Sequence, residues 1–289
     1  MHIVITDSGV GGLSVVAYAE RFVREHGLRE PVQFTFANAA PANDYGYNSM
    51  KTRDEKLATF DRFLRNVTAR FAPDSIYVAC NTLSVLLPDT PFATQSPIPV
   101  MGIVETGVEL LLRELNADPQ RVAMIFATQT TIDSDTYARS LIDHGIDPSR
   151  IVSQACPGLA DTISEDREGT RTRDEIRKWV GVAIAKMQNA NAPVVAALAC
   201  THYGYRKNVF AEAFVDAGKV ATVVNPNESA VDDLFDVDDR GAHHDASVHF
   251  VTRYAIPDAT VEALTFFLEP ISPKTVDAMQ HFEHVPDLF

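Results

Sequence analysis

Two cysteines lie at matching places in the sequence, each at the end of a short apolar run. Cys80 follows such a run in YVACNTLSV, and Cys200 does so in ALACTHYGY. Side chains that carry hydroxyl, amide or imidazole groups come directly after both. A lone cysteine at such a place is more often an inert buried thiol than a reactive one. Two matching cysteines in a chain that contains only three need a further explanation.

Several kinds of chemistry use a cysteine with polar neighbours. Helices that begin just after both cysteines would stabilise their thiolates through backbone N–H groups and the helix dipole. Cys200 and His202 could bind zinc together with Cys80, but no Cys-x-x-Cys or His-x-x-x-His pair supports a zinc site. A Cys–His nucleophile, as in hydrolases or amidases, leaves one cysteine unexplained. Two thiols on opposite faces of one small ligand suit a proton-transfer isomerase, in which one removes a proton and the other delivers one.

Strands that alternate with helices predict where both cysteines lie. Helical periodicity is found in 12–26, 54–70, 105–115 and 174–187. The runs that predict strands are HIVIT, VQFTFA, SIYVA, IPVMGI, RVAMIFA, VVAALA and ATVV. This alternation indicates an α/β fold with mostly parallel sheets, in which functional residues lie just beyond the carboxyl ends of the strands. Both cysteines occupy that place.

The two halves of the chain resemble each other loosely. Asp7 precedes Cys80 by 73 residues, and Thr128 precedes Cys200 by 72. Two similar α/β units would place their functional edges alike, so that the cysteines could approach one shared cleft from opposite sides.

The stretch DSGVGGLS follows the first predicted strand and opens a helix. A dinucleotide fingerprint would need glycine where Ser14 stands, and no P-loop lysine follows. The stretch therefore leaves Asp7 and Ser8 at a strand end, with glycines that allow a small ligand to approach the backbone closely.

Composition excludes several classes of partner. The chain has 289 residues, of which 46% are hydrophobic, and its formal net charge is -14. An acidic chain is a poor match for nucleic acid or an anionic membrane, although a local site can still bind a small anion. Three cysteines without regular spacing do not form a disulfide framework, so a reducing, cytoplasmic location is expected. No apolar run approaches 18 residues, and no basic leader is present.

The acidic tail VDDLFDVDDRGAHHDASVH matches a calcium loop only in part. Asp236, Asp238 and Gly241 fit the pattern, but Arg240 and Ser247 stand where ligands are required. We therefore interpret it as a solvated acidic connection and expect no metal site. VHFVTRY then predicts a strand and ATVEALTFFL a helix, as a C-terminal addition packed on one lobe.

A series of motifs resembles the glutamate racemase family, within the cofactor-independent aspartate/glutamate racemases. In family order these are DSGVGGLS, Tyr45-Gly46 followed by Ser49, ACNT, PVMGIVETGV, ATQTTIDSDTY, QACP and ACTHY. The match runs from about residue 3 to about residue 230. The resemblance implies two pseudosymmetric lobes with the active site in the cleft between them. It places the first lobe at 1–100 plus 206–289 and the second at 101–205.

The resemblance also assigns roles to residues. Cys80 and Cys200 match the two catalytic thiols, with Asp7 assisting the first and His202 the second. Positions that match the substrate-binding residues are Ser8, Tyr45, Gly46, Asn81, Thr82 and Thr201. Neutral donors of this kind satisfy the carboxylates of a small acidic amino acid. No cofactor is implied, and a homodimer is one expected assembly.

Three positions depart from the family pattern, and one cysteine lies outside its thiol pair. Asp44 replaces the usual proline before Tyr45, Ser164 replaces an acidic residue, and Gly204 replaces the proline of CTHYP. An extra acid at Asp44 would repel glutamate if it pointed into the pocket. Cys156 is interpreted as a packing residue.

The sequence thus predicts a racemase that interconverts L- and D-glutamate by two-cysteine proton transfer and so supplies D-glutamate for peptidoglycan. Within the superfamily the alternatives are an aspartate racemase, a hydantoin or maleate isomerase, and a one-cysteine decarboxylase or hydrolase. A non-catalytic protein that binds an acidic amino acid is the alternative of another class.

Overall fold

The chain forms two compact units. The computed structural model describes residues 1–235 and 237–289, so Asp236 of the calcium-loop pattern lies outside the described residues. The first unit contains Met1–Ile103 and Asn227–Phe289, and the second contains Val104–Pro226. The sequence placed the end of the second lobe at residue 205. The second unit instead continues to Pro226, because a strand after residue 205 pairs with the strand that precedes Cys200.

The first unit is built on a parallel sheet with the strand order β10-β9-β2-β1-β3-β4. Its strands are β1 (His2–Asp7), β2 (Val32–Asn38), β3 (Ser75–Val78), β4 (Val100–Gly102), β9 (Ala246–Thr252) and β10 (Glu283–His284). Every residue of β1 except His2 is buried, as expected of a parallel strand that is covered on both faces. The carboxyl ends of all six strands lie at the same edge.

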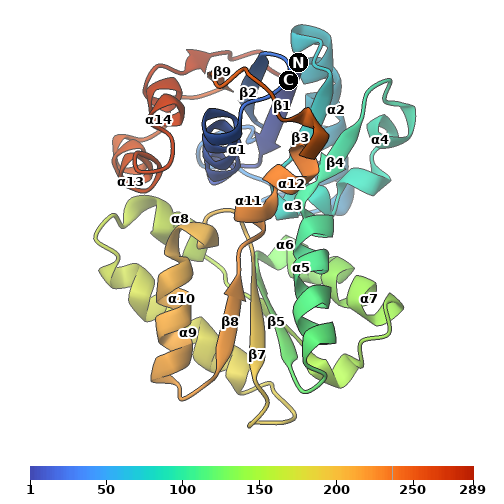
Figure 1. The fold of residues 1–289 in the computed structure, drawn as a ribbon, viewed down its shortest axis with the longest axis vertical. Helices are drawn as coiled ribbons and strands as arrows, with labels where there is room; N and C mark the ends of the chain where they lie inside the picture. Colours follow the sequence, from blue (N-terminus) through green and yellow to red (C-terminus); the bar gives the residue numbers. More distant parts are fainter. Residues whose placement is uncertain (236) are drawn as a thin grey trace. The chain divides into compact units, whose positions relative to one another are not determined.

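Helices cover this sheet, and Figure 1 shows α1 close to β1 and β2. The helices are α1 (Leu13–His26), α2 (Arg53–Phe71), α3 (Asn81–Ser84), α4 (Pro91–Gln95), α11 (Pro226–Ser229), α12 (Val231–Leu234), α13 (Asp258–Leu268) and α14 (Pro273–Gln280), with 3-10 turns η1 (Leu87–Asp89) and η4 (Val237–Asp239). Helix α2 begins after Thr52, whose side chain accepts a hydrogen bond from the backbone N–H of Glu55. It buries Phe60, Phe63 and Val67 along one stripe.

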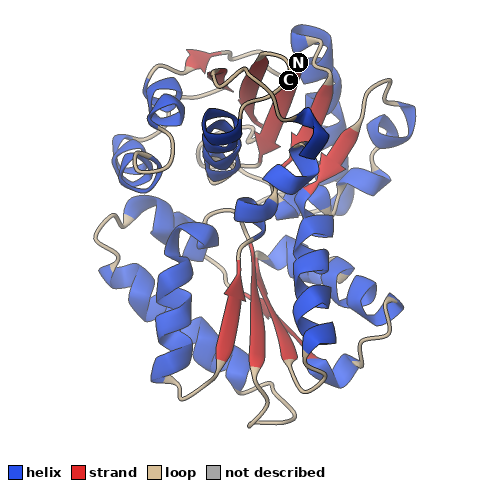
Figure 2. Ribbon diagram, in the orientation of Figure 1, coloured by secondary structure: helices blue, strands red, loops and turns tan. Residues whose placement is uncertain are grey.

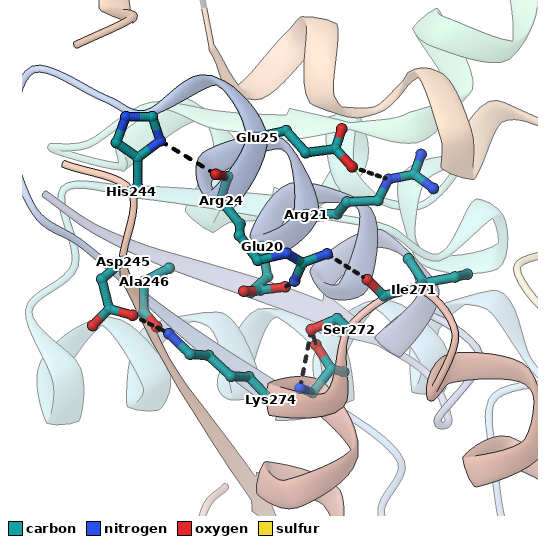
Figure 3. A network of polar contacts seen from close by, with 11 residues as sticks. Glu20, Arg21, Arg24, Glu25, His244, Asp245, Ala246, Ile271, Ser272 and Lys274 are labelled. Carbon is teal, nitrogen blue, oxygen red and sulfur yellow. Dashed lines mark hydrogen bonds and ion pairs between the residues drawn. The ribbon is translucent and has the colours of Figure 1, made fainter. Parts of the chain in front are cut away.

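The C-terminal segment forms part of the sheet of the first unit. The predicted strand and helix are confirmed as β9 and α13. Strand β9 pairs with β2, and β10 pairs with β9, so the tail supplies two of the six strands. Figure 3 shows how polar contacts fix it against α1: Arg24 pairs with Glu20 and donates to the backbone oxygen of Ile271, with an N–O distance of 2.9 Å.

The second unit repeats the arrangement with the strand order β6-β5-β7-β8, all parallel. Its strands are β5 (Val122–Ala127), β6 (Ile151–Ala155), β7 (Val194–Ala199) and β8 (Ala221–Val224). Its helices are α5 (Ile103–Ala117), α6 (Gln129–Asp133), α7 (Thr136–Asp143), α8 (Leu159–Glu165), α9 (Thr170–Ile184) and α10 (Lys207–Asp216), with 3-10 turns η2 (Pro148–Arg150) and η3 (Tyr203–Arg206). Figure 2 shows helices on both sides of β5, β7 and β8.

The duplication read from the sequence has a counterpart in the order of strands. In the first unit the order β2-β1-β3-β4 places the strand that ends at Asp7 beside the strand before Cys80. In the second unit the order β6-β5-β7-β8 places the strand before Thr128 beside the strand before Cys200. The predicted α/β fold with two mostly parallel sheets is therefore confirmed. Among the described helices, none is long and apolar enough to cross a membrane.

Candidate active site

Asp7 is the last residue of β1, an inner strand of the sheet of the first unit. Its side chain is 2% exposed. Helix α1 begins six residues later, at Leu13, and Gly12 allows this close approach. A Cβ atom added at Gly12 would lie 2.8 Å from both Cβ and Oδ2 of Asp7, which is closer than real carbon atoms approach. Gly12 of DSGVGGLS is therefore needed for the packing of α1 against this carboxylate, in addition to any ligand.

Cys80 lies beside Asp7 because β3 pairs with β1. The backbone N–H of Ala79 donates to the oxygen of Thr6, and Cys80 follows at the beginning of α3. The Sγ atom of Cys80 is 3.0 Å from the Oγ atom of Ser8, and Ser8 donates to Oδ1 of Asp7 over 3.4 Å. Thiol, hydroxyl and carboxylate thus form a continuous row. Asn81 and Thr82, the first residues of α3, are buried next to it.

Burial and the charge of Asp7 raise the pKa of Cys80 to about 12. Hydrogen bonds from the Ser8 hydroxyl and from the backbone of Ser8 and Leu83 act in the opposite direction but do not compensate. The sequence predicted a thiolate stabilised by a helix N-terminus. The backbone of Leu83 in α3 does favour the thiolate, but α3 has only four residues, and in the free protein burial and the Asp7 carboxylate outweigh its effect.

The same edge of the sheet carries polar residues that the sequence analysis missed. Asn38 ends β2 opposite Asp7, and the register of β9 places Thr252 beside Asn38. The Nδ2 atom of Asn38 donates to the hydroxyl of Tyr254 over 3.0 Å. Burial, with the charge of Asp7, raises the pKa of Tyr254. The rule that strand ends carry function would have found Asn38, whereas Tyr254 belongs to a tail that gave no such signal.

The loop between β2 and α2 contains two tyrosines in different surroundings. Tyr45, which the resemblance assigned to substrate binding, is 39% exposed and donates its hydroxyl to Glu55 Oε1 over 2.5 Å. Gly46 follows it, and a Cβ added there would meet open space. Tyr47 is 1% exposed, and burial, with a smaller contribution from the charge of Cys80, raises its pKa. The buried tyrosine of this loop is therefore Tyr47, whereas Tyr45 is exposed.

In the second unit Cys200 follows β7 and is also buried. The expected helix does not begin there: a 3-10 turn follows, and α10 begins only at Lys207. Thr201 is buried, and His202 is partly exposed with its ring 6.5 Å from that of Tyr205 between centroids. Cys200 therefore has no α-helix N-terminus of its own.

The third cysteine, Cys156, follows β6 in the second unit. Its thiol donates to the backbone oxygen of Gln154, and its own oxygen accepts the hydroxyl of Tyr203 over 3.2 Å. Burial raises the pKa of Cys156 to about 12. These contacts agree with the packing role predicted for it.

The departures from the family pattern have local consequences. A Cβ added at Gly204 would lie 2.7 Å from the side-chain amide of Asn225, so the residue that replaces proline makes room for that amide. Ser164 donates to the backbone oxygen of Ala160 over 3.0 Å. Asp44 is exposed. Within the described part of the chain, no group of three His, Cys, Asp or Glu side chains is arranged to hold a metal ion.

A family model described as Asp/Glu/Hydantoin racemase matches residues 8–234, which is most of the chain. The chain belongs to the Asp/Glu/Hydantoin racemase family. A glutamate racemase from Chlorobium phaeobacteroides (strain DSM 266 / SMG 266 / 2430) is 31% identical over 213 residues, or 72% of this chain and 70% of the relative.

Crystal structures of two glutamate racemases share the fold of this family member. Isoform RacE1 from Bacillus anthracis gives a TM-score of 0.73 at 19% identity, covering 92% of this chain and 93% of that one. The enzyme from Francisella tularensis subsp. tularensis SCHU S4 in complex with D-glutamate gives a TM-score of 0.71 at 21% identity, and the match covers 99% of this chain and 98% of that one. The predicted resemblance is thus confirmed, and membership of a racemase family makes the protein an isomerase.

Proposed function

We propose that the protein interconverts L- and D-glutamate by proton transfer at the α-carbon between Cys80 and Cys200. The observation that carries the proposal is the row formed by the Cys80 thiol, the Ser8 hydroxyl and the Asp7 carboxylate, in a chain matched to a racemase family over residues 8–234. Relatives that match it are named glutamate racemases, which favours glutamate over the other substrates of the family.

The row accounts for how Cys80 exchanges a proton. Because the Ser8 hydroxyl donates to Asp7, its oxygen can accept the proton of the Cys80 thiol. The raised pKa keeps Cys80 as a thiol in the free protein, which is the form that delivers a proton to the substrate. An α-ammonium group bound nearby would oppose the charge of Asp7 and lower the pKa of Cys80, so that the thiolate form becomes accessible in the reverse direction.

Cys200 acts on the opposite face of the substrate in this proposal, with His202 as its assisting group. Reversal of the reaction exchanges the roles of the two thiols. Hydroxyl, amide and backbone donors at Ser8, Asn81, Thr82 and Thr201 hold the carboxylates. The reaction would take place in the cytoplasm and supply D-glutamate for peptidoglycan.

The test is exchange of the α-hydrogen in D₂O, followed by NMR together with optical rotation. L- and D-glutamate are incubated with the wild-type protein, Cys80→Ser and Cys200→Ser, with L- and D-aspartate and a hydantoin as the other substrates of the family. We expect both enantiomers of glutamate to exchange and both substitutions to lower racemisation at least about 10³-fold, because each removes one of two required proton-transfer groups. Absence of exchange with glutamate would overturn the substrate, and racemisation that survives either substitution would overturn the two-thiol mechanism.

A further inference from the structure

Cys200 is followed by a 3-10 turn instead of the expected helix, so its position depends on how that turn is held. The turn η3 consists of Tyr203–Arg206. The backbone N–H of Tyr203 donates to the backbone oxygen of Cys200 over 3.0 Å, which joins the turn directly to the residue that carries the thiol. A 3-10 turn has poorer hydrogen-bond geometry than an α-helix. Side-chain contacts of the turn must therefore help to fix it.

Arg206, the last residue of the turn, contacts the C-terminal end of α8. Its Nη2 atom donates to the backbone oxygens of Asp166 and Arg167, over 2.5 and 2.8 Å. Helix α8 ends at Glu165 and Asp166 caps it, so the guanidinium binds carbonyl groups at a helix end, where arginine is favoured. One side chain thus ties the segment after Cys200 to a neighbouring helix.

The loop that accepts Arg206 is shaped for this close contact. The side chain of Asp166 closes the loop, because it accepts hydrogen bonds from the backbone N–H groups of Gly169 and Thr172 over 3.2 and 2.8 Å. Gly169 has a φ of +79°, and a Cβ atom added there would lie 2.9 Å from Nη1 of Arg206. A larger residue would strain the backbone and displace the guanidinium. The loop therefore offers Arg206 a fixed place.

A second side chain holds the beginning of the turn. Tyr203 is 1% exposed, and its hydroxyl donates to the backbone oxygen of Cys156 over 3.2 Å. Cys156 directly follows β6, so this contact fastens the residue after His202 to the carboxyl edge of the sheet. With Tyr203 held at one end and Arg206 at the other, the turn that begins after Cys200 has little freedom to move.

We propose that Arg206 is a positioning residue for Cys200, which it holds in place by tying the end of η3 to the C-terminal end of α8. The proposal rests on the proposed function in one respect, since Cys200 there exchanges a proton with the α-carbon. Proton transfer needs the two atoms within hydrogen-bond reach, so a displacement of about 1 Å is costly. All the contacts that carry the proposal lie within the second unit.

The test compares Arg206→Met and Arg206→Lys with Arg177→Met in the full-length protein. Arg177 belongs to the same unit and donates to Asp216 Oδ2 over 3.1 and 2.8 Å, but both side chains are exposed. Alkylation of the buried Cys200 by iodoacetamide is followed by peptide mass spectrometry at pH 8, with the buried Cys156 as internal reference. Arg206→Met should make Cys200 react about tenfold faster, because a loosened turn opens more often, and should leave Cys156 unchanged.

Racemisation kinetics separate positioning from a merely structural role. Arg206→Met should lower kcat about tenfold and leave KM unchanged, because the displaced thiol transfers a proton and does not hold the carboxylates. Arg206→Lys should recover most of the loss, since a single nitrogen of Arg206 serves both oxygens and an ammonium can donate to them. Arg177→Met should match the wild type in both measurements, because exposed ion pairs contribute little.

An unchanged alkylation rate of Cys200 in Arg206→Met would overturn the proposal, as would equal acceleration of Cys200 and Cys156, which indicates general loosening of the unit. A raised KM with an unchanged kcat would assign Arg206 to substrate binding and overturn it too. Because alkylation needs no substrate, it decides whether Arg206 holds Cys200 even if the wild-type protein exchanges no α-hydrogen, an outcome that would contradict only the proposed function.

Discussion

At the scale of single residues, the position of the Asp7 carboxylate depends on the absence of a side chain at Gly12. Gly12→Ala places a methyl group 2.8 Å from Oδ2 of Asp7 and 3.1 Å from the ring of Phe36, so the carboxylate must move. We expect racemisation to fall at least about 10²-fold, because small displacements of an assisting group have effects of this size. The measurement is the rate of D-glutamate formation from L-glutamate, with circular dichroism to confirm the fold.

Gly181 provides the matched control. It lies inside α9, and a Cβ added there meets nothing within 4 Å. Gly181→Ala should leave racemisation unchanged and stabilise the protein by about 0.5–1 kcal/mol, because alanine favours a helix interior. Equal activity of the two alanine variants would show that the space at Gly12 does not matter for Asp7.

At the scale of elements, one ion pair on α1 stabilises the packing of α1 against the C-terminal segment more than the neighbouring ion pair on the same helix does. Arg24 pairs with Glu20, whose side chain is 2% exposed, and also holds Ile271 (Figure 3). Arg24→Met leaves a buried carboxylate without this cation and should lower the free energy of unfolding by about 2 kcal/mol, less than for a fully buried pair because Arg24 is half-exposed. Urea denaturation at pH 7 measures the loss.

Arg21 on the same helix is the control for Arg24. Its nitrogen lies 4.0 Å from Glu25, and both side chains are about half-exposed. Exposed ion pairs of this kind contribute little to folding stability, so Arg21→Met should change the free energy of unfolding by no more than about 0.5 kcal/mol. Similar losses in both variants would contradict the importance of the buried carboxylate.

How far the sequence predicts these elements depends on what signals them locally. Apolar runs predicted β1, β3, β5 and β7, and hence the strand ends that carry Asp7 and Cys80. Strand β6 was missed because Ser153 and Gln154 interrupt its apolar pattern at a sheet edge. Contacts between segments distant in sequence leave no local pattern: the pairing of Asn38 with Tyr254 and the burial of Tyr47 required the fold.

At the scale of the whole molecule, each unit holds a buried thiol that resists ionisation. Burial raises the pKa of both Cys80 and Cys156 to about 12, from an ordinary value of 9.0. The folded chain therefore keeps both protons up to about pH 12, whereas the unfolded chain loses them near pH 9. The raised pKa means that this contribution to stability is complete below pH 9 and is lost as the pH rises toward 12.

The free energy of unfolding should accordingly fall between pH 9 and pH 11, by up to about 1.4 kcal/mol per pH unit for each thiol. Urea denaturation at half-unit intervals of pH measures this slope. Cys156→Ala removes one thiol outside the proposed proton-transfer row, so it should reduce the thiol contribution to the slope by about half and leave racemisation at pH 7 unchanged. An unaltered slope would mean that Cys156 ionises alike in both states, because a group contributes to the pH dependence only through a difference in bound protons between the folded and unfolded chain.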